Sequence, residues 1–174
     1  DINHSIMNTI KIFFFIAFCT LVSIRCKREE FTSVPVSADP LASLLGSWTL
    51  KNVTQKDETA EIKNSPYVSM NITSLFPYTQ YKLTLTGTAG ATTGTYAAVP
   101  GDAPQIIRYN TGNWQVDDPK NPKKITFING TDKTEMQIGT YPTSFNNGFK
   151  LKQTKVDAAT NKPAVTYEYE FVKQ

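Results

Sequence analysis

Residues 165–171 read Val-Thr-Tyr-Glu-Tyr-Glu-Phe (VTYEYEF), and this stretch decides the fold class. Apolar or aromatic side chains alternate with polar ones along it, which is the period of a β-strand. The apolar face consists of Val165, Tyr167, Tyr169 and Phe171. A strand with one apolar and one polar face is typical of an antiparallel sheet whose outer side meets water.

The same alternation recurs along most of the chain. It predicts further strands at 48–51, 81–86, 93–99, 105–109, 112–116, 124–128, 134–138 and 149–152. Asn129-Gly130 is a strong hairpin signal, Asn147-Gly148 precedes another strand, and DDPKNP at 117–122 is a turn that no strand could cross. We expect an all-β fold of about eight to ten antiparallel strands, in a barrel or a sandwich. A single up-and-down barrel is favoured because closure removes exposed sheet edges.

One short helix is expected before the first strand, at residues 40–45. Asp39 can cap the free backbone N–H groups, and Pro40 suits the first helical position. Gly46 can end the helix. Residues 55–76 have the least regular pattern, with one helical turn expected at 74–76.

The N-terminal part has the pattern of an exported bacterial lipoprotein. Read from Met7, Lys11 precedes an apolar run at 12–24, which is shorter than the ~20 residues of a membrane-spanning helix. Cys26 follows this run and is the expected site of cleavage and lipidation. The expected organisation is an upstream extension (1–6), a signal peptide (7–25), a lipidated tether (26–40) and a barrel domain (41–174).

The residues around Cys26 leave two alternatives open. Ser23 and Arg25 stand where a usual lipobox has leucine and a small residue, so an uncleaved anchor or an ordinary signal peptide would also fit. Glu29 and Glu30 resemble the signal that exports Bacteroidota lipoproteins to the cell surface, although they also suit a soluble tether. The expected location is the outer membrane, on its periplasmic face or at the cell surface.

Few side chains offer catalytic chemistry. The single histidine, His4, precedes the expected mature chain, which excludes a histidine base and histidine metal sites. Cleavage would leave Cys26 as the only cysteine, so neither a disulfide nor a cysteine metal site is expected. The net charge of +3 is balanced, and no basic cluster is interleaved with aromatic residues. We therefore expect no enzymatic activity, no cofactor, no metal and no nucleic-acid partner.

Two sets of acidic residues suggest alternative functions. Glu168 and Glu170 share one strand face about 7 Å apart, near the separation of an inverting glycosidase pair. That face should meet solvent, so a carboxylate-dependent hydrolase is the least favoured function. Asp117, Asp118 and Asn121 could ligate a hard cation, but they lack the spacing of a calcium loop and suit a turn.

Three sequence elements occur in order within the predicted barrel: LGSWTL at 45–50, GTY at 94–96, and GNWQVDD at 112–118 followed by PKKITF at 122–127. With the lipoprotein-like N-terminus, this set resembles the lipocalin-like lipoproteins of Bacteroidota, small secreted domains of largely unassigned function. The resemblance covers residues 45–174 and implies a lipocalin-like barrel. Its structural signature is formed by Gly46, Trp48, Gly94, Tyr96, Gly112 and Trp114.

The Gly-x-Trp element at 46–48 also resembles the first strand of true lipocalins, where the tryptophan closes one end of the barrel. Other aromatic residues could line a ligand cavity or fill the core, and the sequence leaves both open. The expected ligand contacts lie near predicted turns: Tyr78, Tyr109, Trp114 and Tyr141.

The expected function is non-enzymatic binding of a small apolar or glycan ligand, or of a partner protein. The protein would be held at the outer membrane by its N-terminal lipid. The alternative is a structural or accessory subunit of an outer-membrane complex.

Overall fold

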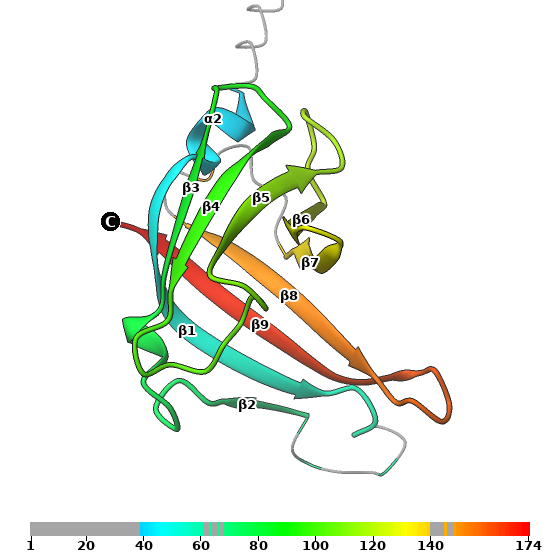
Figure 1. Ribbon diagram of the computed structural model, residues 1–174. Helices are drawn as coiled ribbons and strands as arrows, with labels where there is room; N and C mark the ends of the chain where they lie inside the picture. The colour runs from blue at the N-terminus through cyan, green and yellow to red at the C-terminus, as the bar shows by residue number, and fades with distance from the viewer. Residues whose placement is uncertain (1–38, 61–62, 64–65, 67, 140–144, 146–147) are drawn as a thin grey trace, which may run out of the picture. The chain divides into compact units, whose positions relative to one another are not determined.

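The computed structural model describes residues 39–60, 63, 66, 68–139, 145 and 148–174, all within one compact unit, Ser37–Gln174 (Figure 1). Cys26, the predicted signal peptide, Tyr141 and Asn147 lie outside the described residues. The described part contains the helices α2 (Pro40–Leu44) and η2 (Tyr78–Gln80) and the strands β1 (Gly46–Asp57), β2 (Ser69–Asn71), β3 (Lys82–Gly87), β4 (Thr93–Val99), β5 (Thr111–Val116), β6 (Lys124–Asn129), β7 (Asp132–Ile138), β8 (Phe149–Val156) and β9 (Pro163–Lys173).

The strands close into an antiparallel barrel. From β3 to β9, each strand pairs with the next one along the chain. β9 then pairs with β1 from Trp48↔Lys173 to Asp57↔Val165, which completes a ring of eight strands within the described residues. β2 lies outside this ring and pairs only with β1, at Thr54–Lys56. The structure confirms the predicted all-β, lipocalin-like, up-and-down barrel.

One end of the barrel, here called the closed end, is covered by α2 (Figure 1). Asp39 caps the helix as predicted, because its Oδ1 accepts a hydrogen bond from the N–H of Leu41 at 2.9 Å. The fully buried Trp48 donates from Nε1 to the carbonyl of Leu44 at 2.9 Å and packs edge-on against Phe149. The indole thereby joins the helix to the first strand and to the core.

The glycine–aromatic motifs of β4 and β5 are two halves of one arrangement. The strand register places Gly94 opposite Trp114 and Tyr96 opposite Gly112. A Cβ atom at Gly94 would lie 2.7 Å from Trp114 Nε1, and one at Gly112 would lie 2.9 Å from the ring of Tyr96. Each glycine therefore leaves the space that the aromatic side chain on the neighbouring strand fills.

The prediction of a strand at 105–109 is wrong. These residues belong to the connection between β4 and β5, and the adjacent Ile106 and Ile107 are both buried, at 5% and 1% exposure. A strand with one wet face would bury only every second side chain. The Gln105 amide also donates to the carbonyl of Ile107 at 2.7 Å, which holds the segment in a local turn.

The pattern of alternating apolar and polar residues also did not predict β2, because the three residues of this strand are all exposed and carry no hydrophobic pattern. Residues 74–76, expected as one helical turn, lie instead in a non-helical turn, in which the N–H of Leu75 donates to the carbonyl of Ile72, and the helical turn follows at η2. Among the residues that the structure describes, no helix combines the length and apolar character needed to cross a membrane.

Candidate functional site

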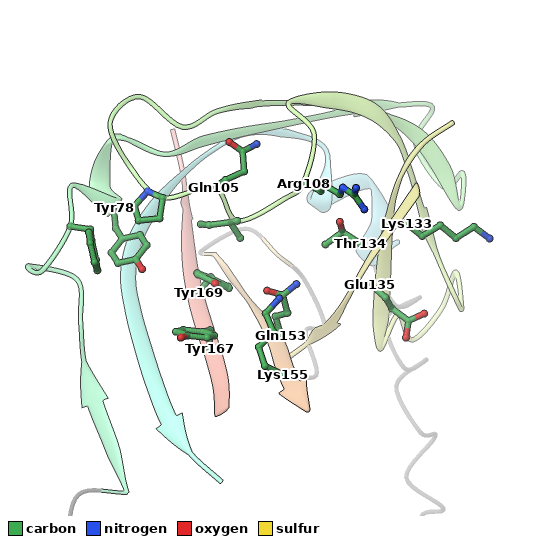
Figure 2. Close-up of a pocket in the computed structure, with 13 residues that line it drawn as sticks. Tyr78, Gln105, Arg108, Lys133, Thr134, Glu135, Gln153, Lys155, Tyr167 and Tyr169 are labelled. Atoms are coloured by element: carbon green, nitrogen blue, oxygen red, sulfur yellow. The ribbon is translucent and has the colours of Figure 1, made fainter. Parts of the chain in front are cut away.

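The end of the barrel opposite α2, here called the open end, contains a cavity of about 840 Å³ (Figure 2). Its walls come from the segment before β3, the β4–β5 connection and the strands β7, β8 and β9. The lining residues are Phe76, Tyr78, Pro104, Gln105, Ile106, Arg108, Lys133, Thr134, Glu135, Gln153, Lys155, Tyr167 and Tyr169.

The cavity exists because β7 and β8 separate toward the open end. These strands share only two register pairs in the described residues, Gln137↔Lys152 and Ile138↔Leu151. β8 nevertheless stays paired with β9 as far as Val156. Beyond the last shared pair, Thr134 on β7 and Lys155 on β8 line the same cavity from opposite strands.

Two parallel tyrosine rings form one wall, which we call the tyrosine platform: Tyr167 and Tyr169. They are two residues apart on β9, so their side chains point to the same face of the barrel. Their ring centroids are 6.3 Å apart and their planes differ by 17°. Tyr78, on η2, lies beside this platform (Figure 2). Tyr169 is only 6% exposed, so the ring face that a flat or cyclic ligand could meet belongs chiefly to Tyr167.

The hydroxyl groups of Tyr78, Tyr167 and Tyr169 form no hydrogen bond with another residue of the described part. Burial raises the pKa of Tyr169 well above its ordinary value, and the nearby tyrosines add to this rise. Burial also raises the pKa of Tyr78, with a further contribution from Tyr167. Both groups therefore stay protonated at neutral pH and can each donate one hydrogen bond to a ligand.

Charged side chains surround the mouth of the cavity. Arg108 Nη1 lies 3.2 Å from Asp132 Oδ1, and Tyr109 donates its hydroxyl to the other oxygen of the same carboxylate at 2.5 Å. The guanidinium also lies 5.6 Å from the centre of the Tyr109 ring. Together these contacts hold Arg108 at the rim, although its side chain is 66% exposed.

The four ligand contacts expected from the sequence have different positions. Tyr78 lines the cavity, whereas Tyr109 lies next to it and supports Arg108. Trp114 is fully buried and donates from Nε1 to the carbonyl of Thr86 at 3.1 Å, away from the cavity. Tyr141 lies outside the described residues.

Sequence reasoning missed the platform as a site, because Tyr167 and Tyr169 were predicted only as aromatic residues of the interior, in the core or a cavity, and not as ligand contacts. The available signal was the spacing of the two tyrosines, which places both rings on the same inward face of β9. The contributions of Arg108 and Lys155 had no local signal in the sequence. They depend on how the β4–β5 connection folds back and on where β8 leaves β7.

The paired glutamates lie on the outer face, as the alternation predicts. Glu168 accepts from Lys150 Nζ at 2.6 Å and lies 3.1 Å from Lys152 Nζ, and Glu170 lies 3.5 Å from Lys51 Nζ. Burial acts to raise the pKa of Glu168, but the two lysines outweigh it and hold the pKa below its ordinary value. A carboxylate kept ionised in this way is a poor general acid.

The acidic turn at 117–122 has its oxygens engaged by the backbone. Asp117 Oδ1 accepts from the N–H groups of Asp118, Lys123 and Lys124, and Asp118 Oδ1 accepts from that of Lys120. These contacts are the turn chemistry of aspartate. Within the described ranges, no group of three or more histidine, cysteine, aspartate or glutamate side chains is arranged to hold a metal ion.

Neither a comparison with protein-family models nor a search of curated proteins finds a match to this chain. Its function is therefore inferred from the barrel and from the residues around the open end.

Proposed function

We propose that this protein binds a glycan, without catalysis, in the open end of its lipocalin-like barrel. The observation that carries the proposal is the tyrosine platform beside a cavity of about 840 Å³. Tyrosine rings stack on the apolar faces of sugar rings, and their hydroxyls can hydrogen-bond to sugar oxygens. The unused hydroxyls of Tyr78, Tyr167 and Tyr169 suit a ligand that carries many acceptors.

The shape of the interior favours a glycan over a long apolar ligand. The barrel below the cavity is filled by its own side chains, among them Leu50, Leu83, Trp114, Phe127 and Phe171, each at most 1% exposed. A long acyl chain needs a deep apolar tunnel, and these residues occupy its place. The cavity is instead broad and bordered by amide, hydroxyl and charged groups, which fits a ligand with polar groups around its rings.

The binding test compares two tyrosine variants. Tyr167→Ala removes half of the platform, whereas Tyr81→Phe changes a tyrosine that does not line the cavity. Calorimetric titration with oligosaccharides that bind the wild type in a glycan array should show affinity about three- to tenfold weaker for Tyr167→Ala, the usual contribution of one aromatic contact. Tyr81→Phe should bind normally. Failure of the wild type to bind any glycan would overturn the proposal.

We also propose that the protein belongs to the lipocalin-like lipoproteins and is attached to the outer membrane through an acylated Cys26. The support is the order of the apolar run at 12–24, the cysteine and the polar segment that follows. Expression in a bacterium that processes lipoproteins, followed by mass spectrometry, should find acyl chains on Cys26. Cys26→Ser should abolish the modification and Cys19→Ser should not; the reverse result would overturn the assignment.

A second candidate function, docking to a partner protein, is favoured by exposed apolar side chains near β2. Val68, Met70, Leu75 and Phe76 are 37%, 53%, 61% and 51% exposed, and all lie between residues 68 and 76. Large apolar side chains gathered on a surface often mark an interface. Met70→Ser with Leu75→Ser should then weaken co-purification with outer-membrane proteins and leave glycan binding intact. Unchanged co-purification would remove this candidate.

A further inference from the structure

The cations around the open end outnumber the available anions. Glu135 is the only carboxylate that lines the cavity in the described part, and it is paired with Lys124 at 3.1 Å. Arg108 pairs with Asp132 through one nitrogen, Nη1, which leaves other N–H groups of the guanidinium free to donate. Lys155 forms no ion pair with any described residue. The mouth of the cavity therefore carries unbalanced positive charge.

Two of these cations, Arg108 and Lys155, line the same cavity as the tyrosine platform. Arg108 lies on the β4–β5 connection and Lys155 on β8, on different walls of the cavity (Figure 2). Lys155 lies two residues beyond Gln153 on the same strand, so both side chains project from the same face. The pairing of Gln153 with Tyr167 shows that this is the face that carries the platform.

Lys133 differs although it also borders the cavity. Its side chain extends away from the tyrosines in Figure 2. It also lines a separate groove on the outer face of β5, β6 and β7, together with Lys124 and Glu135. Lys133 is thus a matched control, since it is a lysine at the same rim whose ammonium group is directed elsewhere.

We propose that the ligand is an acidic glycan, with a sugar ring on the tyrosine platform and a carboxylate facing Arg108 and Lys155. This inference rests on the proposed function and specifies its ligand class. A cleft lined by one sign of charge concentrates ligands of the opposite sign. A guanidinium that is already oriented by a neighbour loses little freedom when it binds a carboxylate. A neutral sugar would leave Lys155 without an ion-pair partner and would offer no charge to the remaining N–H groups of Arg108.

The test uses matched pairs of oligosaccharides that differ only in charge. The probes are trigalacturonic acid and a hyaluronan tetrasaccharide, each beside its neutral methyl ester, with decanoate as an apolar acid. Calorimetric titration of the purified protein should show at least one acidic sugar binding about fivefold or more tightly than its ester, the contribution of one exposed ion pair. Raising the salt concentration to 0.5 M should weaken binding of the acidic sugar and leave binding of its ester unchanged.

The variants locate the effect. Lys155→Met and Arg108→Gln should each weaken binding of the acid about fivefold and leave binding of the ester unchanged. Lys133→Met should change neither, and thermal unfolding checks that each variant is folded. If Lys133→Met were as damaging as Lys155→Met, a general effect of net charge would replace the proposed contact.

The remaining outcomes separate this inference from the proposed function. Equal binding of acid and ester would overturn the acidic ligand and leave glycan binding intact. Binding of decanoate alone would overturn the glycan class, and with it both proposals. If the protein bound neither these probes nor any member of a broad glycan array, both proposals would also be overturned.

Discussion

Gly94→Ala should be among the most destabilising single-methyl changes in this barrel. The added Cβ would overlap the carbonyl oxygen of Thr86 and lie 2.7 Å from Trp114 Nε1. These two atoms form the hydrogen bond of the buried Trp114 indole, at 3.1 Å. The methyl group would therefore enter the space between a donor and its acceptor, where neither the backbone nor the indole can move easily.

The expected cost follows from two contributions. Overpacking a close-packed core by one methyl group costs typically about 1–3 kcal/mol. Separating the Trp114 N–H from its acceptor leaves a buried donor unpaired, which costs about 1–3 kcal/mol. The two effects overlap, so we expect a loss of about 3 kcal/mol in the free energy of unfolding. For a domain of this size that corresponds to a fall of roughly 10 °C in Tm.

The assay is urea and thermal unfolding followed by circular dichroism, with Gly130→Ala as the control. A Cβ at Gly130 meets no atom within 4 Å, although its φ of +60° makes alanine cost about 1 kcal/mol. Gly94→Ala should thus lose clearly more stability than Gly130→Ala. Equal losses would refute the argument that Gly94 is required by the space Trp114 occupies.

Three further predictions concern stability. Gly112→Ala should cost about as much as Gly94→Ala, because its Cβ would meet the ring of Tyr96 at 2.9 Å and overlap the Ile128 carbonyl; a loss near zero in urea unfolding would contradict the reciprocal arrangement. Trp48→Phe should cost about 1–2 kcal/mol, because it removes the hydrogen bond to Leu44 that holds α2, and hydrogen exchange should show faster opening of the Leu41–Leu44 amides. The pKa of Glu168 is lowered by Lys150 and Lys152, so its stabilisation is complete above the ordinary glutamate pKa and is lost as the pH falls below about 4. Glu168→Gln should therefore be less stable than the wild type at pH 7 and lose less stability on acidification. If both proteins lost the same amount of stability as the pH falls, the ion pairs of Glu168 would be contradicted.

The strands were predictable where each residue obeys the same alternation. Residues 165–171 lie within β9 with their apolar side chains inward, and Asn129-Gly130 begins the hairpin loop between β6 and β7. Prediction failed at 105–109, where the adjacent Ile106 and Ile107 are both buried although they belong to a connection and not to a strand. It also failed at β2, whose pairing with β1 requires no hydrophobic pattern.

The sequence by itself determined the all-β class, the helix cap at Asp39 and the outward face of Glu168 and Glu170, because these follow from local periodicity and turn chemistry. Only the tertiary structure decided that β9 closes onto β1 and that β7 and β8 separate at one end. That separation creates the cavity and brings Tyr78, Arg108, Lys155 and Tyr167 around it from four parts of the chain. The sequence pattern records which face a side chain takes on its own strand, whereas a binding site depends on distances between strands that local patterns do not encode.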